Sequence, residues 1–171
     1  MLPLVSAQRR EQALRYKHTF GQYCCLKSWL MLYETMANGE WANGEWLYNE
    51  HGKPYIEGGP YFSISHCKEG IAVAIDDQPV GIDIEGIRHA EPDLIERTMN
   101  EEEKSKVERQ KTKDESDRMF TRLWTRKEAI VKAEGVGIVS FEQLQGIGHQ
   151  PSAFSIQTID EEKYIVSIAY K

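Results

Sequence analysis

Two short runs in the sequence have side chains whose types and spacing suit chemistry on a phosphate group. In the run GIDIE, Asp83 and Glu85 are two residues apart, so on a β-strand their carboxylates point to the same side. In the run WTRKEAIVK, Glu128 and Lys132 are four residues apart and share one face of a helix. Three carboxylates and one lysine brought together would suit a hard divalent cation that holds phosphate oxygens.

Each pair taken alone also has an ordinary structural explanation. A D-x-E pair occurs on many half-exposed strands, and Glu128 with Lys132 could equally be an ion pair on a helix surface. The apolar runs Ile71–Ile75 and Ile82–Ile84 favour the metal-binding interpretation, because they predict a buried sheet in which unpaired carboxylates are costly. A bound cation removes that cost.

A third polar segment, FSISHC, ends an apolar strand pattern. Ser65, His66 and the backbone amides that follow could bind a phosphate, or His66 could be a structural histidine; the residues leave both interpretations open. No partner base marks Cys67 as a nucleophile. The sequence has no phosphate-binding P-loop, dinucleotide-binding glycine motif, paired C-x-x-C, H-E-x-x-H or G-x-S-x-G elbow.

The composition indicates an ordinary globular protein. The chain has 171 residues, of which 40% are hydrophobic and 28% charged, which suits one domain or two small lobes. A net charge of -6 argues against a generally basic nucleic-acid binder. Three cysteines, two of them adjacent, make no disulfide framework, and no apolar run is long enough to span a bilayer. We therefore expect a cytoplasmic protein that binds neither nucleic acid nor a membrane.

The apolar patterns predict helices, then strands, then helices, then strands. Helices are expected over Ser6–Met36 with a break at Gly21, over Pro92–Gln110, and over Ser116–Glu134 with a stop at Gly135. Strands are expected over Trp46–Tyr48, Tyr61–Ser65, Ile71–Ile75, Val80–Glu85, Phe154–Ile159 and Tyr164–Ala169.

Three further expectations concern local structure. The strands ending at Ile75 and starting at Val80 are predicted to form a hairpin or a linked pair. The tandem run ANGEWANGEW, residues 37–46, is predicted to be a loop or hairpin. The aliphatic part of Lys127 is predicted to join an apolar helix stripe with Phe120 and Ile130.

The order of elements predicts an α+β fold with helices packed on antiparallel sheets. Because the order repeats once, it also predicts two α+β lobes, residues 1–79 and residues 80–171. The segment 1–4 leads almost directly into a helix, so the N-terminal lobe is expected to lack a first strand.

Four elements in order, GKPY (52–55), FSISH (62–66), VGIDIE (80–85) and WTRKEAIVK (124–132), resemble those of the 4'-phosphopantetheinyl transferases. The resemblance is to the two-lobed type that activates carrier proteins of peptide and polyketide synthetases. It implies two similar lobes related by a pseudo-two-fold axis, with the active site in the cleft between them.

The resemblance also implies an activity. The family transfers the 4'-phosphopantetheine arm of coenzyme A to a serine of an apo acyl or peptidyl carrier protein, and adenosine 3',5'-bisphosphate is released. By motif match, Asp83, Glu85 and Glu128 would hold Mg²⁺, and Glu128 would also be the candidate general base. A monomer is expected, with the acidic carrier docking on basic residues near the helix at Glu101–Arg109.

The remaining implied roles concern coenzyme A. Lys53, Ser65 and His66 would bind its phosphates, and Lys132 would lie beside the pyrophosphate as a catalytic cation. Arg9 would match a basic residue of the family's first helix that contacts the nucleotide phosphate.

Two other functions are compatible with the same residues. One is a Mg²⁺-dependent phosphohydrolase that acts on a nucleotide. The other is a non-catalytic module that binds a carrier domain or coenzyme A. Release of adenosine 3',5'-bisphosphate only when a carrier is present would distinguish transfer from both.

Overall fold

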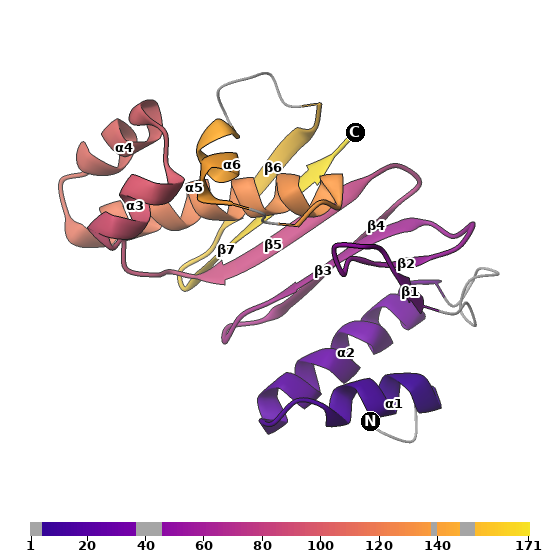
Figure 1. The fold of residues 1–171 in the computed structure, drawn as a ribbon. Helices are drawn as coiled ribbons and strands as arrows, with labels where there is room; N and C mark the ends of the chain where they lie inside the picture. The colour runs from indigo at the N-terminus through magenta and orange to yellow at the C-terminus, as the bar shows by residue number, and fades with distance from the viewer. Residues whose placement is uncertain (1–4, 37–45, 138–139, 148–152) are drawn as a thin grey trace.

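The computed structural model describes residues 5–36, 46–137, 140–147 and 153–171 (Figure 1). The helices are α1 (Ala7–Leu14), α2 (Thr19–Met36), α3 (Pro92–Thr98), α4 (Glu101–Glu108), α5 (Lys113–Glu134) and α6 (Phe141–Gly146). The strands are β1 (Trp46–Tyr48), β2 (Pro54–Ile56), β3 (Tyr61–His66), β4 (Ile71–Asp76), β5 (Val80–Gly86), β6 (Ser155–Asp160) and β7 (Tyr164–Tyr170).

The strands form antiparallel sheets on which the helices pack. β1 pairs with β2, β3 pairs with β4, and β7 is the central strand of a three-stranded sheet in the order β5-β7-β6. Helix α5 lies across β5, β6 and β7, while α1 and α2 lie on the side of β3 and β4 (Figure 1). The predicted α+β class is confirmed. The division into lobes at residues 79 and 80 stays a prediction.

Helix boundaries follow capping side chains more closely than glycines. Ser6 caps α1 as predicted, since its hydroxyl accepts from the Arg9 amide at 3.2 Å. The break predicted at Gly21 is wrong: α1 ends at Leu14, and Gly21 lies inside α2. An isolated glycine costs a helix only about 1 kcal/mol, which tertiary packing overrides.

The helix predicted over Pro92–Gln110 is two helices. The Asn100 side chain accepts from the Glu103 amide and the Glu103 carboxylate accepts from the Asn100 amide, both at 3.0 Å. This capping box starts a new helix, α4. A second capping box, Thr112 with Glu115, starts α5 three residues before its predicted beginning. The predicted stop is confirmed, because Gly135 is left-handed at φ +75°.

The six predicted strands match the structure to within one residue at each end, and of the two relations predicted for β4 and β5, a hairpin or a linked pair, the hairpin is wrong. β4 and β5 are not a hairpin, since β4 pairs with β3 and β5 pairs with β7. They are consecutive strands linked by a turn in which the Asp76 carboxylate accepts from the Gln78 amide at 2.9 Å. Strand β2 and helix α6 were not predicted; the proline at the start of β2 is typical of a turn.

Some expectations fall outside the described residues. The segment 1–4, which bears on the expected loss of a first strand, is one of them, and so is the tandem run except for Trp46 at the start of β1. Within the part of the chain that the structure describes, no helix is long and apolar enough to cross a bilayer.

Helix α5 touches β5 backbone to backbone at Gly81. A Cβ at this position would collide with the Ala129 carbonyl oxygen and lie 3.0 Å from the Ala133 Cα. Ala129 and Ala133 are buried together with Ala169 of β7, so small residues on both elements allow this approach. Gly81 therefore fixes the position of α5 along β5.

We predict that Gly81→Ala destabilises the protein by about 3 kcal/mol, because the added methyl meets backbone atoms that cannot rotate away. Urea unfolding followed by circular dichroism measures the free energy of unfolding. Gly146→Ala is the matched control, because a Cβ there has no neighbour within 4 Å. Equal stability of the two variants would show that α5 is not held at this contact.

Candidate active site

Three polar side chains from β3, β5 and α5 meet in the interior. The Lys132 Nζ lies 2.6 Å from the Asp83 Oδ1 and donates to the Ser65 Oγ at 3.0 Å. The Ser65 hydroxyl in turn donates to the Asp83 Oδ1 at 2.8 Å. Asp83 is 2% exposed and Ser65 is 8% exposed, whereas the Lys132 side chain is 29% exposed, so a half-buried lysine pairs with a buried carboxylate. Residues separated by up to 67 positions in the sequence thus form one cluster.

The strand and helix periodicities explain how the carboxylates reach this place. Because Gly81 faces α5 and side chains alternate along β5, Asp83 and Glu85 face α5 as well. Glu128 and Lys132 are one turn apart on the part of α5 that crosses β5. The same-side prediction for each pair is consistent with this packing.

The carboxylates repel one another in a poorly solvated region. Burial raises the pKa of Glu128 to about 7, the negative charge of Asp83 adds to the shift, and Lys132 opposes it. Burial also raises the pKa of Glu85, again with help from Asp83, while Arg88 and Lys132 oppose the shift. The cluster therefore has more negative charge than its cations balance.

One oxygen of this cluster has no partner. The Asp83 Oδ2 is buried and makes no hydrogen bond to the described residues. A buried, unpaired carboxylate oxygen is costly, and an added cation would offset that cost. Across the described ranges, no group of three or more His, Cys, Asp or Glu side chains is arranged to hold a metal ion as it stands. The chemistry of these residues nevertheless suits a hard divalent cation, since carboxylate oxygens are its preferred ligands and the Asp83 Oδ2 has no hydrogen-bond partner among the described residues.

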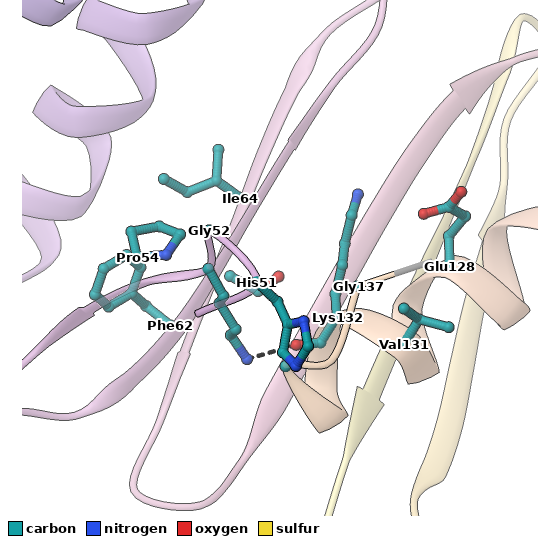
Figure 2. Close-up of a pocket in the computed structure, with 12 residues that line it drawn as sticks. His51, Gly52, Pro54, Phe62, Ile64, Glu128, Val131, Lys132 and Gly137 are labelled. Atoms are coloured by element: carbon teal, nitrogen blue, oxygen red, sulfur yellow. Dashed lines mark hydrogen bonds between the residues drawn. The ribbon is translucent and has the colours of Figure 1, made fainter. Parts of the chain in front are cut away.

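A cavity of about 350 Å³ opens beside the cluster. Figure 2 shows Glu128 and Lys132 of α5 on one side of it and Phe62 and Ile64 of β3 on the other. His51 and Lys53, from the turn before β2, line the same cavity. Its wall therefore combines apolar side chains with two cations and a carboxylate, as in many sites for small organic anions.

Lys53 reaches this cavity from a distant turn. Its ammonium donates to the carbonyl oxygen of Lys132 and, at 3.3 Å, to that of Val80. Burial lowers the pKa of Lys53. The contact of this group with a phosphate of coenzyme A stays a prediction.

Two predicted site residues lie elsewhere. His66 is exposed at the end of β3, with its ring edge-on to Phe20 at a centroid distance of 6.5 Å. Arg9 is 7% exposed, lies 4.0 Å over the Trp46 ring and donates to the Cys25 sulfur at 3.5 Å. The structure does not bring Arg9 to Asp83, and α1 lies away from α5 (Figure 1). The phosphate-binding roles of both residues stay predictions.

The sequence predicts burial only for the aliphatic part of Lys127, but the structure buries its ammonium as well. Lys127 is 2% exposed, and its ammonium pairs with the Glu103 carboxylate at 2.7 Å. It also donates to the carbonyl oxygens of Leu144 and Ile147, so the whole side chain, not only its aliphatic part, is interior. A signal was present: Lys127 occupies the apolar face of the predicted helix, seven residues after Phe120.

A comparison with protein families identifies the family of this chain. The model of the 4'-phosphopantetheinyl transferase superfamily matches residues 79–169, which include β5, α5 and the strands that pack with them. The chain belongs to the 4'-phosphopantetheinyl transferase superfamily.

Individual relatives agree with this assignment. The chain is 31% identical to a 4'-phosphopantetheinyl transferase of Bacillus subtilis over 143 residues, which is 81% of this chain and 63% of that protein. It is 28% identical to the transferase Sfp of Bacillus subtilis strain 168 over 165 residues, 93% of this chain and 73% of Sfp. The transferase gsp of Aneurinibacillus migulanus is 31% identical over 137 residues, 78% of this chain and 57% of gsp. The chain thus spans less than two thirds of the first and third relatives.

The raised pKa of Glu128 predicts a pH-dependent stability for the metal-free protein. The folded state keeps this proton up to about pH 7 whereas the unfolded chain loses it near its ordinary value of 4.5, so stability falls as the pH rises between these values. Glu128→Gln cannot ionise. Its stability relative to the wild type should rise by about 1 to 3 kcal/mol between pH 4.5 and pH 8.

Urea unfolding in the presence of a chelator, at several pH values, measures this difference. Glu108→Gln, at an exposed position on α4, is the control and should give a curve parallel to that of the wild type. If the curve for Glu128→Gln were also parallel to that of the wild type, burial and Asp83 would not raise the pKa of Glu128.

Proposed function

We propose that this protein transfers the 4'-phosphopantetheine arm of coenzyme A to a serine of an apo carrier protein and releases adenosine 3',5'-bisphosphate. The observation that supports this function best is the buried cluster of Ser65, Asp83 and Lys132 beside a cavity lined by Glu128 and Lys53, in a chain of the phosphopantetheinyl transferase superfamily. Because the relatives are longer, the activity, the substrates and the carrier partner are all part of the proposal.

The reaction is a displacement at phosphorus. The carrier serine oxygen forms a bond to the phosphorus that bears the pantetheine arm, and the bond from that phosphorus to the oxygen of the adenosine bisphosphate breaks. Glu128, whose carboxylate lines the cavity, is the candidate acceptor of the serine proton. The Lys132 ammonium, already directed into the cluster, would stabilise negative charge on the diphosphate.

A magnesium ion is the second part of the proposal. Asp83, Glu85 and Glu128 would hold it, with the unpartnered Asp83 Oδ2 as one ligand atom. When bound, Mg²⁺ supplies positive charge that neutralises the diphosphate and its leaving group. Asp83 is also the residue that orients Lys132 and Ser65 by direct contact, so it serves two tasks.

The carrier partner would dock by charge complementarity. The family resemblance implies an acidic carrier, and the predicted docking segment is the helix at Glu101–Arg109. Lys104 already binds the carboxylates of Glu96 and Glu101 at 2.8 and 2.9 Å, so its charge is largely satisfied within the protein. Arg109, exposed at the end of α4, is therefore the better candidate for contact with the carrier.

Transfer can be measured directly. Incubation of the protein with coenzyme A, Mg²⁺ and an apo carrier should add one phosphopantetheine arm to the carrier, detected by intact mass, together with one adenosine 3',5'-bisphosphate. Asp83→Ala should lower this rate by about 100-fold or more, because it removes a proposed metal ligand and the partner of Lys132. Asp77→Ala, at an exposed turn position, should leave it unchanged.

The other outcomes of this assay exclude the proposal. Release of the bisphosphate without a carrier would indicate hydrolysis. Binding of coenzyme A without any release would indicate a non-catalytic module. A wild-type rate for Asp83→Ala would show that the metal assignment is wrong.

A further inference from the structure

The turn between β1 and β2 braces the C-terminal end of α5. The Asn49 Oδ1 accepts from the amides of His51 and Lys53 at 3.0 and 2.8 Å, which closes the turn on itself. The Gly52 amide donates to the Asn49 carbonyl oxygen at 2.9 Å, and Gly52 supplies the left-handed φ of +80° that the turn needs. The Nδ2 group of the Asn49 side chain takes no part in these hydrogen bonds and points out of the turn.

That outward group reaches α5. The Asn49 Nδ2 donates to the Gly135 carbonyl oxygen at 2.8 Å, across 86 positions of the sequence. Lys53, at the other end of the same turn, donates to the Lys132 carbonyl oxygen. The last carbonyls of a helix have no partner within the helix and attract donors and positive charge. The turn thus caps α5 from a distant part of the chain.

The capped segment is the one that holds the central lysine of the candidate active site. Gly135 directly follows α5, and Lys132 lies in its last turn, with its Nζ between Asp83 and Ser65 at 2.6 and 3.0 Å. A small rotation of this last turn would move the ammonium out of reach of Asp83. Helix ends fray unless something holds them, and here the turn does so.

We infer that Asn49 is a positioning residue that fixes the last turn of α5 and thereby places Lys132 for reaction. The inference rests on the proposed function, since Lys132 acts there on the diphosphate. Asn49 itself lies outside the lining of the cavity, so its effect passes through the helix rather than through the substrate.

The test uses Asn49→Asp, which keeps the oxygen that accepts from the turn amides and removes the donor to Gly135. Gln145→Glu is the matched control: it removes an amide-to-carbonyl hydrogen bond of the same 2.8 Å length, from α6 to Glu96 of α3. Should Asn49→Asp not fold, Asn49→Thr, which keeps an acceptor oxygen in the turn, replaces it with the same expectations.

The first measurement is amide hydrogen exchange of the last turn of α5, which requires no activity. Protection of the Gly135 amide, which donates to Val131, should fall by about 10-fold in Asn49→Asp and stay unchanged in Gln145→Glu. Unchanged protection in Asn49→Asp would overturn the inference that the turn at Asn49 holds the last turn of α5. This result stands whether or not the protein transfers phosphopantetheine.

The second measurement is a double-mutant cycle on transfer. Asn49→Asp should lower kcat by about 10-fold with little change in KM for coenzyme A, because a misplaced catalytic group slows the reaction more than binding. In a Lys132→Ala background it should cause no further loss. An equal loss of kcat in both backgrounds would overturn the positioning role, whereas a wild-type protein that makes no transfer would reject only the proposed function.

Discussion

The close approach of α5 to β5 at Gly81 is the constraint on which the rest of the structure depends. With no side chain at this position, the helix backbone at Ala129 and Ala133 rests directly on the strand. That contact fixes which turn of α5 faces which part of β5, so Glu128 and Lys132 lie over Asp83 and Glu85. Any larger residue would lift the helix and separate the two halves of the acidic cluster. Gly81, two residues before Asp83 and without a side chain of its own, therefore sets the geometry of the candidate site.

The buried carboxylates lower the folding stability of the protein but provide ligands for a cation. Burial disfavours the charged forms of Glu85 and Glu128, and the negative charge of Asp83 adds to this effect, so the pKa values of both glutamates are raised. Lys132 offsets part of this cost by binding the Asp83 Oδ1, yet the Asp83 Oδ2 has no hydrogen-bond partner among the described residues. Such an arrangement favours ligands that bring positive charge to the carboxylates and negative charge to the lysine. A divalent cation with a diphosphate meets both demands, which is why the proposed function accounts for an otherwise unfavourable interior.

Much of this could be predicted from the sequence, because short-range periodicity determines it. The two-residue spacing of Asp83 and Glu85 and the four-residue spacing of Glu128 and Lys132 predict shared faces, and both segments were placed on the correct element types. The predictions that were wrong concern features that depend on competition between local and distant contacts. Gly21 stays helical because α2 packs against β4, and the burial of Lys127 depends on Glu103 and on carbonyl groups of α6. The bracing of α5 by the turn at Asn49 joins positions 86 apart, which no local pattern encodes.

The account is tested most directly by locating the cation. Crystals of the protein grown with coenzyme A and Mn²⁺, which stands in for Mg²⁺ and scatters anomalously, would show where the ion binds. The account predicts one strong anomalous peak bounded by the carboxylates of Asp83, Glu85 and Glu128, with the diphosphate of coenzyme A against it and against Lys132. A bound diphosphate with no peak among these three carboxylates, or a peak elsewhere on the molecule, would contradict it.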